Sequence, residues 1–463
     1  MGALKGDFHF VMSNVFVNNA LTRTIGQWWN RLLGAAKDGS FSDQDEMYAS
    51  HRTSRDYICN MFGIATWGMV FPVLTVVITQ LTNAELAGMF SLAFITATLL
   101  MMIGNYGVRT YQVSDIDERH SFADYEVNRF ITCALMMVVG VGYCMVRGYG
   151  GDMLTISIGV YFYRMIDALA DVYEGRLQQQ DKFYLAGISQ AVRSVLVVLF
   201  FSLALLITRN VGVASIVMAV VAALTFVFLT FPLGLIETPK SPRCTFESVV
   251  VIFKQCFPLF LAVFLFNLIE SMPKFVMEGT LAYKYQLYFN ALFFPAQAIL
   301  LSIGFIYKPQ LLRLSSIWAN PRQRRRFDLI IVAVMALIVV ITAACAAFMA
   351  GPGIPLMSFM YGLSFEHYRT LALLMVVAGG ITAAIDFFYA IITVLRHAGD
   401  VTKIYLICFA VSVVLPVILI NLLGLMGAVV SYLAVMALLL VLLIIEYAHI
   451  RQRIERDRNP YGA

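Results

Sequence analysis

The sequence predicts an all-α, polytopic membrane protein with about 12 transmembrane helices in two six-helix bundles. Of its 463 residues, 60% are hydrophobic and only 13% are charged, whereas a soluble domain has about 45–50% apolar and about 25% charged residues. The apolar residues gather into runs of the ~20 residues that a helix needs to cross a bilayer. The interruptions between these runs are short, so no sizeable soluble domain is inserted. This composition excludes a soluble enzyme and a nucleic-acid-binding protein with a conventional surface.

The twelve apolar runs divide the chain into a first bundle at 58–235, a cytoplasmic linker at 236–250 and a second bundle at 251–447. We expect the spans at 58–79, 84–104, 129–147, 153–172, 184–207, 212–235, 251–271, 284–306, 328–350, 368–394, 404–421 and 427–447. Transporters commonly have such a layout, with the substrate site between the two halves and alternating access to it.

The two ends of the chain lie outside the spans. Residues 1–57 contain no run long enough to cross a bilayer. Within them, 11–36 has the apolar and aromatic residues of an amphipathic helix on the membrane surface, and a solvated tail is the alternative. Residues 448–463 form a basic tail.

The distribution of basic residues predicts the orientation of the helices, because cytoplasmic loops carry an excess of Lys and Arg. Placing the N-terminus inside puts most of the 33 Lys and Arg residues on the cytoplasmic side. The outer side then holds only Arg147, Arg209, Lys274, Lys284 and Arg369. We therefore expect both termini to be cytoplasmic. The basic run at 322–326 is interpreted as a topology determinant on anionic lipid.

Charged residues within the spans are the strongest functional signal, because each is costly in a bilayer and needs a partner or a water-filled cavity. Arg164, Asp167 and Asp171 fall on one face of the fourth span. Arg193 lies on the fifth span, and at ~1.5 Å per residue Arg164 and Arg193 are both about 12–14 Å from the cytoplasmic surface. The two arginines are candidates for a basic pocket that binds an anionic group. The alternative is that Arg164 pairs with Asp167 or Asp171 and joins helices.

Uncharged polar residues form a stripe along the eighth span. Gln286, Asn290, Gln297 and Gly304 share one face, which suits sugar hydroxyls or a wet lumen. Hydrogen bonding between helices is the alternative.

Three further ionisable residues lie in or near spans. Asp386, on the tenth span, is a candidate for ion coupling or for a counter-charge to the arginines, as are Asp167 and Asp171. Glu270 and Lys274 are expected near the outer surface, where long side chains reach water at little cost.

Neither cysteine nor histidine indicates a metal site or a cofactor. The seven cysteines show no CxxC spacing, and the six histidines are dispersed without an HExxH motif. We expect no catalytic residues, no metal and no cofactor.

Three stretches resemble a known family. They read YFYRMIDALADVYEGRLQQQDKFYLAGISQAVRS (161–194), GNYGVRTYQVSDIDERHSF (104–122) and MPKFVMEGTLAYKYQLYFNALFFPAQAILLSIGFIYKPQL (272–311). Together with the twelve-span layout, they resemble the Wzx-type polysaccharide-repeat flippases of the multidrug/oligosaccharidyl-lipid/polysaccharide exporter superfamily, from about residue 55 to 447.

The resemblance implies a flippase of the bacterial cytoplasmic (inner) membrane. Such a protein moves undecaprenyl-diphosphate-linked oligosaccharide repeat units to the outer leaflet for cell-surface polysaccharide assembly. Its partners would be the lipid-linked oligosaccharide, membrane lipids and other polysaccharide-assembly membrane proteins. Arg164 and Arg193 match the family's cationic cavity.

Two other hypotheses about the function remain open. A drug/cation antiporter of the same superfamily would share the architecture, but the arginines oppose a cationic substrate. A membrane glycosyltransferase or polymerase would act on the same lipid-linked sugars, but such enzymes usually carry their catalytic residues on a large outer loop, and the outer connections here are short.

Overall fold

The computed structural model describes residues 52–458 except 116–117, 239–243, 309–310, 312–313, 315–316, 319–323 and 396–397. Within these ranges the chain is helical throughout, without strands, and 12 helices are long and apolar enough to cross a membrane. The predicted all-α fold with twelve spans is confirmed. The surface helix expected at 11–36 lies outside the described residues.

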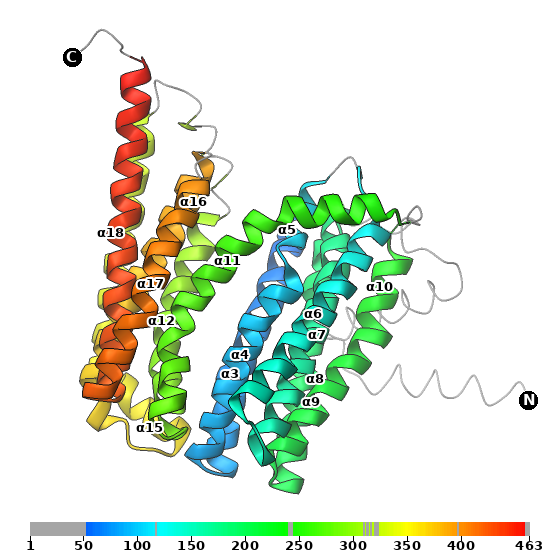
Figure 1. Cartoon of the computed structure of the whole chain (residues 1–463), viewed down its shortest axis with the longest axis vertical. Coiled ribbons are helices and arrows are strands. Elements are labelled where there is room, and N and C mark those ends of the chain that lie inside the picture. Colours follow the sequence, from blue (N-terminus) through cyan, green and yellow to red (C-terminus); the bar gives the residue numbers. More distant parts are fainter. Residues whose placement is uncertain are drawn as a thin grey trace, which may run out of the picture.

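The helices form two lobes, which stand side by side in Figure 1. The first lobe comprises α3 (Arg52–Leu81), α4 (Ala84–Asn105), α5 (Val108–Ser114), α6 (Phe122–Arg147), α7 (Gly151–Gln179), α8 (Phe183–Thr208), α9 (Val211–Thr225) and α10 (Phe231–Ile236), with a π-helical turn at Phe226–Thr230. The second comprises α12 (Lys284–Tyr307), α14 (Arg324–Phe348), α15 (Ile354–Tyr361), α16 (Arg369–Val394), α17 (Ala398–Leu423) and α18 (Leu425–Arg458), with a π-helical turn at Met349–Gly353 and a 3-10 turn at Glu366–Tyr368.

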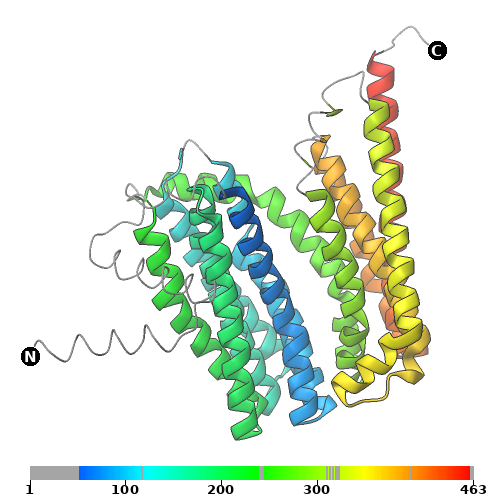
Figure 2. The same ribbon diagram turned by 180° about the vertical axis from the view of Figure 1, so that it is seen from behind.

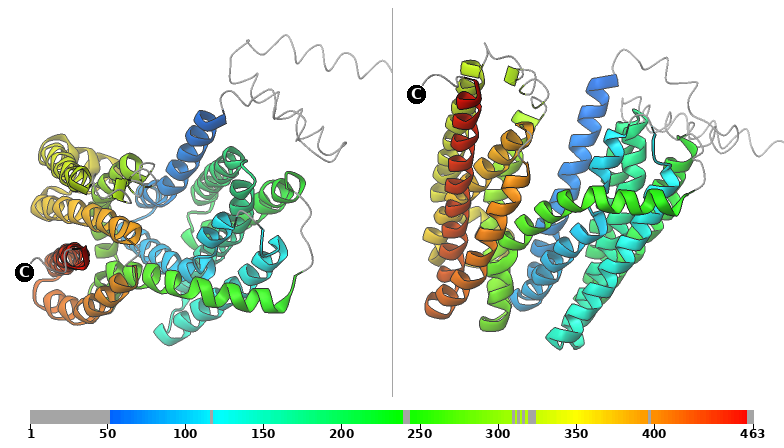
Figure 3. Two further views of the ribbon diagram at one scale, coloured as in Figure 1. Left: turned by 90° about the horizontal axis from the view of Figure 1, so that it is seen from above. Right: turned by 45° about the horizontal axis from the view of Figure 1, so that its top comes forward.

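The helix α11 (Phe246–Thr280) belongs to both lobes. Its first part crosses the first lobe and its second part descends into the second lobe (Figures 1 and 3). The rings of Phe253 and Phe260 pack on Tyr106 of the first lobe, whereas Phe266 packs on Tyr405 of the second. The helix contains Pro258, which lacks an N–H and permits a bend at this point. The boundary that we predicted at 251 therefore falls inside a helix, and the first turns of that helix pack on the first bundle.

Most observed helices extend beyond the predicted spans, and in two of them the extension bears on the site. The helix α6 begins at Phe122 rather than 129, because Ser121 and Asp124 form a capping box at its start. Arg129, which the predicted span places at the very end of the helix, is consequently two turns inside it and fully buried. The helix α11 continues to Thr280 rather than 271, past Glu270 and Lys274.

The lobes converge at one end and diverge at the other (Figure 2). At the converging end, a Cβ atom added to Gly88 of α4 would lie 1.9 Å from the carbonyl oxygen of Tyr283. The helices α3 and α6 end there, and the predicted orientation makes it the outer end. At the diverging end, which the predicted orientation makes the cytoplasmic end, a cavity of about 380 Å³ lies between α3 and α12, lined in part by Asn60, Ile64 and Leu301.

Close backbone contact joins α3 to α8. A Cβ atom added to Gly187 would lie 2.4 Å from the carbonyl oxygen of Cys59. We expect Gly187→Val to lower the free energy of unfolding by about 1–3 kcal/mol, because the helices must separate to admit the side chain. Thermal unfolding in detergent measures this. Gly142→Val is the control, because a Cβ atom there meets nothing within 4 Å, and equal losses in the two variants would contradict the prediction.

Candidate functional site

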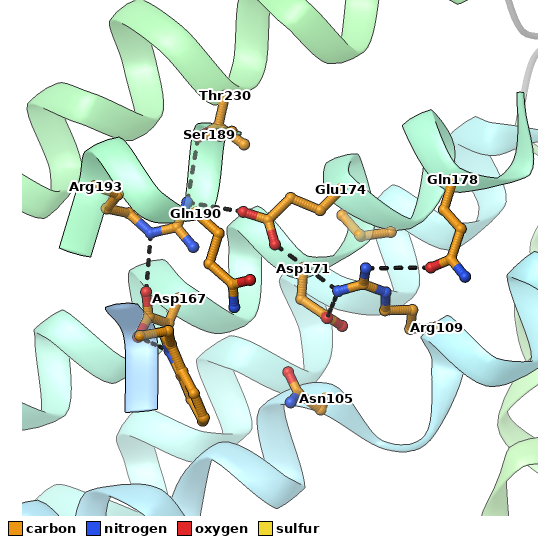
Figure 4. A network of polar contacts seen from close by, with 12 residues as sticks. Asn105, Arg109, Asp167, Asp171, Glu174, Gln178, Ser189, Gln190, Arg193 and Thr230 are labelled. Carbon is orange, nitrogen blue, oxygen red and sulfur yellow. Dashed lines mark hydrogen bonds and ion pairs between the residues drawn. The ribbon is translucent and has the colours of Figure 1, made fainter. Parts of the chain in front are cut away.

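A network of charged side chains occupies the first lobe, and Asp167 of α7 lies at one end of it (Figure 4). One carboxylate oxygen of Asp167 accepts hydrogen bonds from the indole N–H of Trp67 at 3.0 Å and from Arg164 at 3.1 Å. The other accepts from Nε of Arg193 at 2.9 Å. Arg164 and Arg193 therefore share one carboxylate, and the alternative that we left open for Arg164, pairing with Asp167, is what the structure shows.

Arg193 of α8 is held on two further sides. Its guanidinium donates to Glu174 at 2.9 Å and to the hydroxyl of Thr230 at 3.3 Å, and its side chain is only 2% exposed. Because its hydrogen bonds go to protein groups, Arg193 serves to hold α7, α8 and the π-helical turn together. We predicted that Arg164 and Arg193 would surround one anionic ligand. In the structure they are joined by the carboxylate of Asp167 instead.

Asp171, one turn further along α7, holds two other arginines. Arg109 of α5 and Arg129 of α6 each approach a different oxygen of Asp171 at 2.8 Å. Arg129 also donates to the side chain of Asn105 at 2.7 Å. Burial opposes the charge of Arg109, but Asp171 and Glu174 beside it raise its pKa above the ordinary value. Asp171 is thus a counter-charge to Arg109 and Arg129, rather than to Arg164 or Arg193, the arginines that our interpretation named.

A central cavity of about 180 Å³ lies between the lobes. Its first-lobe wall includes Trp67, Phe71, Phe94 and Arg164, and its second-lobe wall includes Asn267, Glu270, Ser271, Lys274, Asn290, Phe293 and Gln297. Of the two arginines that we predicted for the site, Arg164 lines this cavity and Arg193 does not. Of the predicted amide stripe, Asn290 and Gln297 line it as well.

Arg164 presents its cation between aromatic rings. Its guanidinium carbon lies 4.3 Å from the ring centroid of Phe94 and 4.7 Å from that of Trp67. Its Nε is buried without a hydrogen-bond partner among the described residues. Arg164 therefore lines the cavity with a guanidinium group that is not fully hydrogen-bonded, although Asp167 balances part of its charge.

Lys274 faces Arg164 from the other lobe and is a residue that our sequence reasoning misplaced. It lies within α11 and is 5% exposed, whereas we expected it at the outer surface. Its Nζ lies 4.8 Å from the ring centroid of Phe293, and within the described part of the chain no carboxylate lies within 4.0 Å of it.

A helical pattern could have revealed this second wall. Asn267, Glu270, Ser271 and Lys274 follow the i, i+3, i+4, i+7 spacing of one helix face. Through Glu270 and Lys274, both a carboxylate and an ammonium group of α11 border the cavity. The carboxylate of Glu270 also accepts a hydrogen bond from the hydroxyl of Tyr432 at 3.3 Å.

Two further residues that we predicted for the site, Gln286 and Asp386, lie outside the central cavity. Gln286 donates its amide to the backbone carbonyl of Lys274 at 2.6 Å, and so fixes α12 against α11. Asp386 of α16 accepts from the hydroxyl of Tyr307 at 2.6 Å and pairs with Lys308 at 3.1 Å. It lines the cavity at the cytoplasmic end rather than the central one. Across the described ranges, no three His, Cys, Asp or Glu residues form a group that could hold a metal ion.

Comparison with known proteins gives matches in three-dimensional structure. No protein-family model matches the chain, and no curated protein matches it in sequence. An inward-facing multidrug-resistance MATE transporter of the MOP superfamily matches with a TM-score of 0.64 and 13% identity, covering 87% of this chain and 100% of that one. An outward-facing MATE transporter matches over 87% and 95% of the two chains, with a TM-score of 0.57 and 13% identity.

A third solved structure also matches. It is a MOP superfamily transporter from Pyrococcus furiosus, described as having a binding pocket of reverse polarity that suggests a different function. It matches with a TM-score of 0.55 and 14% identity over 88% of this chain and 96% of that one. With its twelve spans, two lobes and central cavity, the chain has the fold of the MATE transporters of the MOP superfamily.

Proposed function

We propose that the chain is a flippase that moves a lipid-linked oligosaccharide, of the undecaprenyl-diphosphate-linked repeat-unit class, from the inner to the outer leaflet of a bacterial cytoplasmic membrane. The observation that carries the proposal is the pair of cations Arg164 and Lys274, which stand on opposite walls of one cavity between two lobes. A guanidinium group and an ammonium group are the side chains that bind phosphate oxygens.

The rest of the cavity suits the glycan. Asn267, Asn290 and Gln297 offer amide donors and acceptors to hydroxyl groups, and Trp67 and Phe293 offer apolar ring faces. Both lobes contribute to the wall of the cavity. The contacts of a bound substrate would therefore change when the lobes move relative to each other. The matched folds include inward-facing and outward-facing forms, which supports alternating access as the mechanism.

A drug/cation antiporter is the second candidate, and Glu270 is the observation that favours it. Its carboxylate borders the same cavity and would attract a cationic drug, a proton or a sodium ion. The proposed flippase uses the two cations of the cavity instead, and the two functions predict opposite charges on the cargo.

Reconstituted vesicles distinguish the two functions. The purified protein is placed in liposomes that contain an undecaprenyl-diphosphate-linked oligosaccharide, and the leaflet of the lipid is read from its accessibility to a glycan-modifying enzyme added outside. The flippase proposal expects protein-dependent transfer between leaflets. No transfer, together with protein-dependent movement of an organic cation, would replace it with antiport.

Asp386 provides a test of ion coupling. We expect Asp386→Asn to keep translocation at zero ion gradient but to lose its acceleration by an imposed H⁺ or Na⁺ gradient, because the carboxylate is the group that would bind the ion. Leaflet transfer is measured with and without the gradient, and Glu366→Gln, an acid of an exposed pair with Arg369, is the control. Equal acceleration in Asp386→Asn and wild type would remove Asp386 from the coupling scheme.

A further inference from the structure

A buried carboxylate joins the two lobes at their outer end. Glu278 lies in the last turn of α11, beyond the central cavity, and its side chain is 3% exposed. All of its hydrogen-bond donors among the described residues come from the end of α6 and the turn that leads into α7, in the first lobe. The contact therefore crosses from one lobe to the other.

The donors surround both oxygens of the carboxylate. Arg147 binds it in a bidentate manner, with Nε 3.1 Å from Oε1 and the terminal nitrogen 2.7 Å from Oε2. Tyr143 donates its hydroxyl to Oε2 at 2.9 Å, and Tyr149 donates its hydroxyl to Oε1. Charge-assisted and bidentate hydrogen bonds are the strongest polar contacts that proteins form.

The neighbouring contacts show that this is where the lobes close. The carboxylate of Glu85, on α4, accepts from the backbone amides of Tyr283 and Lys284 at the start of α12, each at 3.1 Å. Gln80, at the end of α3, donates to the carbonyl of Met360 at 2.8 Å. Alternating access requires every one of these contacts to open. The Glu278 cluster differs from the others in being made by side chains alone, so single substitutions can dissect it.

We propose that Glu278, Tyr143, Arg147 and Tyr149 form a latch that holds the outer gate shut in the inward-facing state and is released when the transporter faces outward. The proposal rests on the proposed transport function. Polar groups suit such a latch because water can replace their hydrogen bonds when the lobes part, so the opened surfaces stay hydrated. An apolar seal of equal strength would expose hydrophobic area to water on every cycle.

The test measures access to the central cavity from outside the cell. Asn267→Cys places a reporter thiol in the cavity, in a background where the three native cysteines that are not buried, Cys59, Cys244 and Cys345, are replaced by serine. Intact cells that express the protein are treated with a membrane-impermeant maleimide, and the labelling rate of the reporter is measured. We expect Glu278→Gln, and separately Tyr143→Phe with Tyr149→Phe, to raise the rate by about tenfold, because the gate opens more often.

Three controls make the result decisive. Gly88→Ala is the positive control, because its methyl group would collide with the carbonyl of Tyr283 and force the outer gate open. Glu366→Gln is the matched negative control, since its carboxylate pairs with Arg369 within the second lobe and is exposed. Labelling after solubilisation and unfolding reports the amount of protein in each variant and corrects the rates.

The outcomes separate the latch from the transport function. Unchanged labelling in the Glu278 and tyrosine variants, with raised labelling in Gly88→Ala, overturns the latch. Raised labelling in a protein that moves no lipid-linked oligosaccharide in vesicles keeps the latch and rejects the proposed cargo. Because labelling needs no substrate, the two proposals fail independently.

Discussion

Translocation of a lipid-linked oligosaccharide is expected to fall by about tenfold or more in Lys274→Met and in Arg164→Met. Each substitution removes a cation that faces the central cavity, and a hydrogen bond to a charged group contributes about 1.5–3 kcal/mol, or about ten- to a hundredfold. Methionine keeps much of the volume and the apolar contact with the surrounding rings, so the change is mainly one of charge.

The fold should survive these substitutions. In Arg164→Met, Asp167 keeps Arg193 and the indole of Trp67 as partners. The leaflet assay in vesicles measures the effect, and thermal unfolding in detergent checks that the variants are folded. Lys403→Gln removes an exposed lysine and should translocate like wild type. Wild-type rates in both cavity variants would show that the two cations do not bind the cargo.

The double variant tests whether the two cations hold the same group. If Arg164 and Lys274 contact one diphosphate, removing the second costs less once the first is gone, because residues that share a partner are not additive. If they bind separate groups, the two losses multiply. Transfer rates of the wild type, the two single variants and the double variant decide between these outcomes.

Thermal stability should fall most in Asp171→Leu, by about 3–5 kcal/mol, because the substitution leaves the buried Arg129 without its counter-charge. Arg129 is fully buried and would lose its only carboxylate within the described residues, while Arg109 would keep a distant contact with Glu174 at 3.8 Å. The loss is measured as the shift in thermal unfolding of the purified protein.

A second variant distinguishes two causes of the lost stability: removal of the ion pair, and poor packing of the leucine side chain. Replacing Arg129 by methionine together with Asp171→Leu should recover much of the stability, since an apolar pair can substitute for a buried ion pair. Glu366→Gln, in an exposed pair with Arg369, should change stability by less than about 1 kcal/mol. A double variant as unstable as the single one would argue that packing, rather than charge, dominates at Asp171.

The periodicity and composition of the sequence were sufficient to predict the spans. Hydropathy reports which residues avoid water, and that property alone fixes how many helices cross the bilayer. The ends of the helices were harder to predict from the sequence. The capping box of Ser121 and Asp124 starts α6 early, and it is made of polar residues that hydropathy counts as a loop. Arg129 was placed at the end of its span for the same reason.

Within the site, the sequence identified Arg164, Asn290 and Gln297 as residues that face a cavity, because polar side chains in a span need a polar surrounding. The same reasoning could not say that Arg193 would be satisfied by Asp167 and Glu174. Whether a buried charge is free for a ligand depends on which acids lie within about 4 Å of it, and these come from helices that are distant in sequence.

The sequence by itself determined the all-α membrane fold, the number of spans and the presence of costly intramembrane charges, because these follow from local composition and helical spacing. Only the tertiary structure decided how those charges pair. The packing of α5, α6 and α8 on α7 assigns Arg109, Arg129 and Arg193 to carboxylates. The approach of α11 to the first lobe brings Lys274 to the cavity opposite Arg164. Pairing depends on distances between helices, and the crossing of helices is fixed by side-chain packing over the whole molecule rather than by any one segment.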